Sequence, residues 1–259
     1  MVAAVAGDIE RGEALAGLEQ LFKSLPQTPA PQRELPDPGL TPPVLALIHK
    51  PGQVQSQIAL SLPSVNRLNP DYWKINLLMR IFGGNDSMMY TRLRDDLGLV
   101  YSAAFYETYK WSAGVLFGYI GCKGDKTVPA LEETLNIMKL LGRDVPQDEL
   151  EQKRLDALNS FVFNVDTPAD LVNVYGSYYM RREPLDTLDK IQDAFFAADR
   201  DDLRRLAEEY LDPHKIQIFV VADKLIKVKN SRGEEVTLEK ALMDLAGSLG
   251  LPYREIKLR

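Results

Sequence analysis

The sequence has few of the side chains that bind transition metals. Its 259 residues include one cysteine, Cys122, and two histidines, His49 and His214. No HxxEH or HxxxH pattern places two histidines on one helix face, and one cysteine with two distant histidines does not complete a closed zinc site. A single cysteine also excludes an internal disulfide bond. We therefore expect no metal site in this chain and a surface or strand-edge position for both histidines.

Clusters of basic residues and long apolar runs are missing too. The chain has 31 Lys and Arg against 37 Asp and Glu, and its formal net charge is -6. No stretch concentrates cations enough to follow a phosphate backbone, so nucleic acid is not an expected partner. No run reaches the roughly 18 apolar residues that a membrane-spanning helix requires. The first residues, MVAAVAGDIERGE, lack the features of a signal peptide, and both periplasm and cytoplasm remain open as compartments.

Proline is unevenly distributed and suggests how the chain is divided. Residues 25–43 contain a large share of the 16 prolines, so they cannot form a helix or a central strand, and we expect an extended linker there. Before it, Val2–Ala6 predicts a short strand, and leucines at helical spacing between residues 15 and 21 predict a helix. We interpret residues 1–24 as a strand-helix remnant of a preceding domain, because such a unit cannot bury its own apolar face.

The order of elements after the linker is typical of an α+β domain over residues 44–224. The expected strands are 44–49, 55–62, 100–107, 113–121 and 216–221, and the expected helices start near residues 70, 125, 146, 167, 186 and 200. This order predicts helices layered on one mostly antiparallel sheet. Residues 225–259 are expected to form a C-terminal extension with a strand, a turn and a helix, to which we assign no function.

Residues 82–102, FGGNDSMMYTRLRDDLGLVYS, combine glycines, an arginine and a tyrosine around a predicted turn. Gly83 and Gly84 end an apolar helical pattern, but the lysine of a phosphate-binding loop is absent. A short helix with Arg94 follows, and Gly98 predicts a left-handed C-cap. Tyr101 then opens a strand. The pattern predicts that a guanidinium and a phenol flank a single helix-to-strand turn.

Residue types alone leave two interpretations of this pair. In the first, Arg94 forms a surface ion pair with Asp95, Asp96 or another acid, and Tyr101 is an ordinary strand residue, as holds for most isolated surface arginines. In the second, both side chains donate hydrogen bonds to a peptide carbonyl and stabilise negative charge that develops on its oxygen.

Three segments resemble the pitrilysin/insulinase clan of zinc peptidases, family M16. They are PGQVQSQIALSLPSV, NPDYWKINLLMRIFGG and RLRDDLGLVYSA, and they are similar to the inactive domain of that family, which lacks zinc ligands. The opening AVAGDIERGEALAGLEQLF resembles the last strand and helix of the preceding, zinc-bearing domain. The resemblance extends from about Val2 to Asp223. It implies an α+β sandwich like that of the mitochondrial processing peptidase, with two such units forming a clam-shell.

The resemblance also implies roles for particular residues. In the family, an Arg/Tyr pair seven residues apart faces the zinc across the cavity, and here that spacing falls on Arg94 and Tyr101. Family members usually show Ser-Arg-Leu early in this helix, whereas this chain has Ser87-Met88-Met89, so the cavity wall differs in detail.

Further substrate contacts are expected near the same turn and in the first hairpin. Gly83 and Gly84 are candidates for substrate binding. An extended peptide could add to an edge strand, and Gln53 and Gln55 mark the first hairpin, around the turn 50–52, as the place for such an edge.

The sequence therefore predicts the non-catalytic half of a zinc peptidase, inactive alone. Its expected partners are a peptide substrate and a zinc-bearing M16 domain, on the same precursor or a separate subunit, while homodimerisation stays open. The zinc would lie in that partner and no cofactor in this chain. Two alternatives compete with this hypothesis: a structural subunit like the core proteins of a respiratory complex, and an unrelated α+β binding module.

Overall fold

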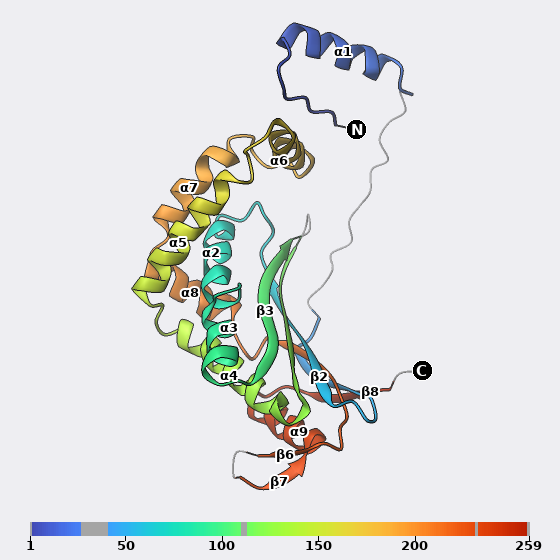
Figure 1. The fold of residues 1–259 in the computed structure, drawn as a ribbon, viewed down its shortest axis with the longest axis vertical. Helices are drawn as coiled ribbons and strands as arrows, with labels where there is room; N and C mark the ends of the chain where they lie inside the picture. Colours follow the sequence, from blue (N-terminus) through green and yellow to red (C-terminus); the bar gives the residue numbers. More distant parts are fainter. Residues whose placement is uncertain (1, 27–40, 110–112, 231–232, 258–259) are drawn as a thin grey trace.

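A six-stranded sheet organises the molecule (Figure 1). The computed structural model describes residues 2–26, 41–109, 113–230 and 233–257. Across the sheet the strand order is β3-β4-β2-β5-β1-β8. The strands are β1 (Val44–His49), β2 (Gln55–Ser64), β3 (Val100–Tyr109), β4 (Gly114–Lys123), β5 (Gln217–Ala222) and β8 (Tyr253–Ile256). Three neighbouring pairs are antiparallel, and the pairs β1·β5 and β1·β8 are parallel.

Helices cover one face of this sheet, as Figure 1 shows for α2, α4, α5 and α8. The helices are α1 (Arg11–Lys23), α2 (Tyr72–Phe82), α3 (Met88–Tyr90), α4 (Thr127–Leu141), α5 (Gln147–Val162), α6 (Pro168–Met180), α7 (Thr187–Ala197), α8 (Arg200–Tyr210) and α9 (Leu238–Ser248). The other helical elements are a π-helical turn, η1 (Thr91–Asp96), and a 3₁₀ turn, η2 (Gly124–Lys126). The predicted α+β class, with helices on a mostly antiparallel sheet, is confirmed. None of the helices in the described part of the chain is long and apolar enough to cross a membrane.

The core lies between the sheet and α2. Along β2, alternate residues point to the helices, and Ile58 and Leu60 are almost completely buried. From the helix side, Ile75, Leu78 and Ile81 are also fully buried. Burial of each such side chain contributes about 1.5–3 kcal/mol. The period of two in the strand and the helical spacing in α2 therefore bring two apolar faces together.

The topology corrects the expected first hairpin. β5 lies between β1 and β2, so these two strands are not hydrogen-bonded to each other, and neither is an edge. The edges of the sheet are β3 and β8. The expectation that an edge for peptide addition lies in the first hairpin is therefore wrong. β5 comes from the other end of the domain and lies between β1 and β2. Local sequence patterns cannot reveal such an insertion.

The N-terminal segment differs in part from expectation. Val2–Ala6 forms no strand, because no described strand lies beside it to complete a hydrogen-bonded ladder. The predicted helix is present as α1, which buries none of its residues; Leu15 and Leu21 are about half exposed. Most of the predicted linker, residues 27–40, lies outside the described residues.

The C-terminal segment packs on the sheet. After Asp223 the chain forms a small hairpin, β6 (Lys227–Lys229) and β7 (Glu235–Thr237), and then α9. β8 follows and pairs in parallel with β1. Residues 231–232 of the predicted turn lie outside the described residues. The division of the chain into domains stays a prediction.

Candidate functional site

The structure brings Arg94 and Tyr101 together. The Arg94 guanidinium donates a hydrogen bond from Nη1 to the backbone carbonyl of Tyr101, and it lies 5.6 Å from the ring centroid of Tyr90. Both residues are exposed, and the Tyr101 side chain is one of the most exposed aromatic groups on the sheet. The guanidinium is thus fixed at one N–H, and most of its five N–H groups remain for a further acceptor.

The first interpretation of Arg94, an ion pair with a neighbouring aspartate, does not hold among the described residues. Asp96 pairs with Arg92 instead, at 3.4 Å, and Arg92 also contacts Glu133 at 2.8 Å. Arg92 therefore takes the surface ion-pair role, and Arg94 is left with the Tyr101 carbonyl.

Two backbone irregularities set the position of the pair. The segment Thr91–Asp96 is a π-helical turn, in which the Leu97 N–H donates to the Arg92 carbonyl at 3.2 Å. Gly98 ends it at φ 57°, which confirms the predicted left-handed cap. On the strand, Val100 pairs with Cys122 and Ser102 with Gly121, so Tyr101 is the extra residue of a β-bulge. Bulges redirect side chains, and π-turns occur often at functional sites.

Gly83 has a packing role that the sequence did not reveal. A Cβ at this position would lie 2.3 Å from the Phe105 Cβ, and the Phe105 N–H donates to the Gly83 carbonyl at 2.7 Å. Only glycine therefore lets the end of α2 approach β3 so closely. Gly84 lacks this constraint, since its nearest neighbour would be 3.7 Å away. Substrate contact by either glycine stays a prediction.

The loop between α2 and α3 is held by a buried cation. Lys153 on α5 is 6% exposed, and its Nζ donates to the Asp86 carbonyl at 2.8 Å. Asp86 has φ 56°, a conformation that is rare outside glycine. Ser87 follows directly and caps α3 by accepting from the Tyr90 N–H at 3.2 Å. These contacts fix the chain just before the turn that carries Arg94.

Gln53 and Gln55 lie in and beside the loop that leads into β2. The Gln53 N–H donates to the Lys50 carbonyl at 3.2 Å, and Gln55 pairs with Lys123 on β4. Their role in substrate binding stays a prediction. Sequence reasoning missed Ser102 and Gln57, which lie closer to the bulge. Their side chains lie on the open face of the sheet, where Gly121 leaves room for them.

The sheet face that the helices do not cover carries aromatic side chains. Tyr106 on β3 and Phe117 on β4 are paired across the strands, with ring centroids 5.5 Å apart. Tyr119 and Val115 lie on the same face, and both are more than a third exposed. Contiguous exposed apolar surface is typical of binding sites. This face adjoins Ser102, directly after the bulge.

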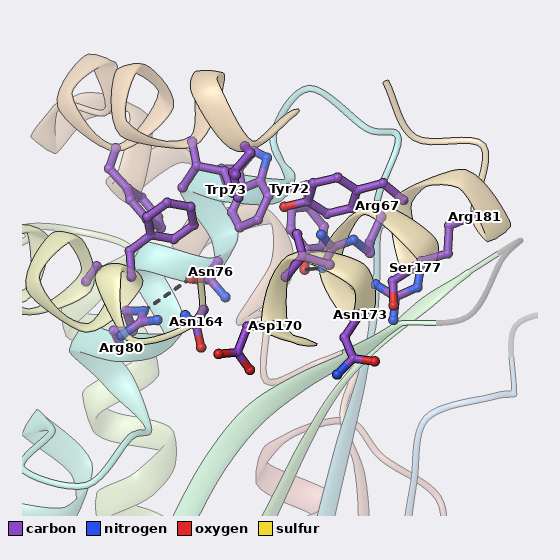
Figure 2. A pocket seen from close by; sticks show the side chains of 17 residues that line it. Arg67, Tyr72, Trp73, Asn76, Arg80, Asn164, Asp170, Asn173, Ser177 and Arg181 are labelled. Carbon is purple, nitrogen blue, oxygen red and sulfur yellow. Dashed lines mark hydrogen bonds between the residues drawn. The ribbon is translucent and has the colours of Figure 1, made fainter. Parts of the chain in front are cut away.

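A hollow lies in the helical layer, between α2 and the helices α5, α6 and α7 (Figure 2). Its volume is about 380 Å³. At one end, Arg67 binds Glu183 through two hydrogen bonds of 2.6 and 3.0 Å and donates to the Tyr72 hydroxyl at 2.6 Å. Burial raises the pKa of Tyr72 to about 12, so this hydroxyl stays protonated. Sequence reasoning missed the hollow, because its residues come from four separate helices.

Glu107 lies under the α2 wall of this hollow. Asn76 Nδ2 donates to its carboxylate, and burial raises the Glu107 pKa above its ordinary value, while the nearby Arg80 guanidinium opposes that rise. Arg80 Nε in turn donates to Asn76 Oδ1 at 3.2 Å.

Metal ligands do not converge in the described residues. No group of three or more His, Cys, Asp or Glu side chains there could hold an ion. His49 Nδ1 accepts from the Lys224 N–H, and His214 Nδ1 contacts the Leu249 carbonyl. Cys122 is buried, which raises its pKa to about 11 and keeps the thiol protonated.

Comparison with known proteins places this fold among relatives of M16 peptidases. An uncharacterized zinc protease from Rickettsia bellii is 27% identical over 152 residues, which are 58% of this chain and 36% of that protein. The M16 inactive-domain structure from Pseudomonas fluorescens superposes with a TM-score of 0.75 at 20% identity, covering 83% of this chain and 52% of that one. A protease from Helicobacter pylori gives 0.74 at 19% identity, covering 84% and 53%.

The chain thus spans about half, or less, of the length of these relatives. The family described as the peptidase M16 inactive domain matches residues 1–155, more than half of the 259 residues. The chain belongs to the M16 inactive-domain family.

Proposed function

We propose that this chain is the substrate-binding half of a zinc peptidase and supplies Arg94 and Tyr101 to a site whose zinc lies on another domain or subunit. The observation that carries the proposal is the Arg94–Tyr101 contact, built by a π-turn and a β-bulge on an exposed surface. Since no described cluster of residues here fits a metal, the zinc belongs to the partner in this proposal. A zinc-bearing M16 domain is the partner that the family membership suggests.

The two side chains have complementary tasks in this proposal. Arg94, fixed at the Tyr101 carbonyl, offers its remaining N–H groups to a carbonyl of the bound peptide. Tyr101 donates its phenolic O–H to the oxygen on which negative charge develops during cleavage. Both are neutral or cationic donors, so in this proposal they stabilise charge and leave bond breaking to groups on the partner.

The uncovered sheet face gives the peptide a surface to lie on. Tyr106 and Tyr119 provide exposed aromatic area on the strands next to the bulge, and the half-buried Phe117 packs against Tyr106. Strand β3 is also an edge of the sheet. Its Phe105 N–H donates to the Gly83 carbonyl, and the outer backbone groups on either side of Phe105 are not paired within the sheet. An extended peptide can therefore bind through its main chain and its apolar side chains together.

The test is peptide cleavage by this chain mixed with a zinc-bearing M16 partner. We expect Arg94→Ala and Tyr101→Phe each to lower kcat/KM by about 10²-fold, the usual cost of removing a donor to the developing oxyanion. Arg92→Ala is the matched control, because Arg92 lies on the same turn and pairs with the exposed Asp96 and the half-buried Glu133; its kcat/KM should stay within about twofold of the wild type.

Each outcome decides between the remaining hypotheses. Unchanged kcat/KM in both variants would contradict the role of the pair. Absence of cleavage with any zinc-bearing partner would favour the structural-subunit alternative. The other alternative, an unrelated binding module, is wrong, because the chain belongs to the M16 inactive-domain family.

A further inference from the structure

The hollow between α2 and α6 combines an apolar floor with a polar rim. The floor includes Trp73 and Phe195, whose rings meet edge to face at 5.9 Å, together with Phe161 and Ile191. Phe195 and Ile191 are each 2% exposed, so the floor continues into the core. With about 380 Å³, the hollow lies at the small end of ligand pockets. It has room for one or two amino-acid side chains.

The rim consists mainly of side chains that both donate and accept hydrogen bonds. Asn164, Asn173 and Ser177 lie along it, and Figure 2 shows Asn164, Asp170 and Asn173 on the same side of the hollow. Among the described residues, no hydrogen bond engages the side chains of Asn173 and Ser177, which lie one turn apart on α6. Carboxamide and hydroxyl groups match the alternating N–H and C=O groups of a peptide main chain.

Charge argues against an anionic ligand here. Three arginines line the hollow, but Arg67 and Arg181 share the Glu183 carboxylate, at 2.6 and 3.8 Å. Burial raises the Glu107 pKa, and the Arg80 guanidinium opposes that rise while its Nε donates to Asn76 Oδ1. The cations are therefore largely neutralised, and a phosphate or nucleotide would find little net positive charge.

Strand β3 links the hollow to the Arg94 turn. Tyr101 stands at the start of β3, and Glu107, which binds Asn76 in the wall of the hollow, stands six residues later. Six strand residues extend over about 20 Å. An extended peptide of about six residues would therefore span the separation of the two sites. It would pass outside Gly83, whose carbonyl accepts from the Phe105 N–H at the edge of β3.

We infer that this hollow is a peptide subsite, which binds one aromatic or large aliphatic side chain on its floor and the adjoining main chain along the Asn173–Ser177 rim. The inference rests on the proposed function in taking a peptide as the ligand. It adds a specificity element about six residues from the bond that is cleaved, on the helical side of the domain.

The experiment measures peptide binding to the full 259-residue chain without any zinc-bearing partner. The probes are the capped tripeptides acetyl-Ala-Phe-Ala-amide and acetyl-Ala-Ser-Ala-amide. The reporter is the indole N–H signal of Trp73 in ¹H–¹⁵N spectra, assigned with Trp73→Phe. We expect a saturable shift with the phenylalanine peptide and an affinity at least about tenfold weaker for the serine peptide, because only the former buries an aromatic ring.

Rim variants separate the main-chain contacts from general effects. The double variant Asn173→Ala/Ser177→Ala should weaken binding of the phenylalanine peptide by about tenfold. Asn136→Ala is the matched control, since Asn136 is an exposed asparagine on α4, outside the hollow; its affinity should equal that of the wild type. Asn173 and Asn136 are exposed and Ser177 is half-buried; thermal unfolding will show that the variants stay folded.

Three results would each overturn the inference: no saturable shift of Trp73, equal affinity for the two peptides, or a rim variant that binds like the wild type. Because neither Arg94 nor Tyr101 takes part in this assay, its failure is distinct from a failure of the proposed function. Binding here with unchanged cleavage by Arg94→Ala would instead remove the proposed function and leave the peptide subsite.

Discussion

The two candidate sites of this domain are held in place by different means. Arg94 and Tyr101 are exposed, and backbone geometry positions them: a π-turn, a left-handed glycine and a β-bulge. The hollow between α2 and α6 depends instead on a partly buried network of side chains around Arg67. A site of the first kind can lose its side chains with little loss of stability, whereas the second kind cannot.

The strongest test of this comparison is the ion pair at the hollow. Arg67→Ala leaves the Glu183 carboxylate, 3% exposed at its side chain, without its bidentate partner. We expect the free energy of unfolding to fall by about 3–5 kcal/mol, as when a buried ion pair is broken from one side. Urea unfolding of the purified chain measures this.

Arg181→Ala is the matched control for that experiment, because Arg181 contacts the same carboxylate from a half-exposed position at 3.8 Å. Its cost should be below about 1 kcal/mol. Equal effects of the two substitutions would contradict the idea that the buried network holds the hollow.

The backbone-built site has one position where stability should also suffer. In Gly83→Ala, the new Cβ would overlap Phe105, at 2.3 Å from its Cβ and 2.4 Å from its carbonyl oxygen. We expect a loss of about 2–3 kcal/mol, typical of overpacking, while Gly84→Ala should change stability by less than about 0.5 kcal/mol. Thermal unfolding distinguishes the two; a tolerated alanine at position 83 would mean that α2 can move away from β3.

The smallest expected effect concerns Glu107 and depends on pH. Because burial raises its pKa in the folded state, folding favours the protonated carboxyl. That contribution is complete below the ordinary pKa of a glutamate and is lost as pH rises through the raised value. Glu107→Gln keeps a neutral acceptor for Asn76. We expect it to be about 1 kcal/mol more stable than the wild type at pH 7, since no buried charge remains.

The check is urea unfolding of both proteins at several pH values between 4 and 8. The difference between them should shrink toward zero at the acid end. A difference that is the same at every pH would show that Glu107 titrates normally and that the α2 wall is not sensitive to charge.

Local signals were the most predictable part of the fold from sequence. The glycine pair ends α2 at Phe82 as expected, Gly98 has its left-handed conformation, and Thr167 caps α6 with a capping box. Each of these depends only on residues a few positions away. Val2–Ala6 shows the limit of such signals, because an apolar run forms a strand only beside a partner strand.

Features that depend on distant parts of the chain could not be predicted. The entry of β5 between β1 and β2 is decided by residues about 170 positions apart. The bulge at Tyr101 depends on the register with β4. The spacing of Arg94 and Tyr101, with the family resemblance, located the pair, but not the carbonyl contact between them. The hollow could not be predicted from the sequence, because its residues come from four helices whose packing depends on distant parts of the chain.

Lys153 gives α5 a part in both candidate sites. Its ammonium group binds the loop before the Arg94 turn, and Ala157 and Phe161, one and two turns further along α5, line the hollow. A side chain that enters the hollow and displaces α5 will therefore also displace the Asp86 carbonyl. The Asp86 loop and one wall of the hollow thus depend on the same helix, α5.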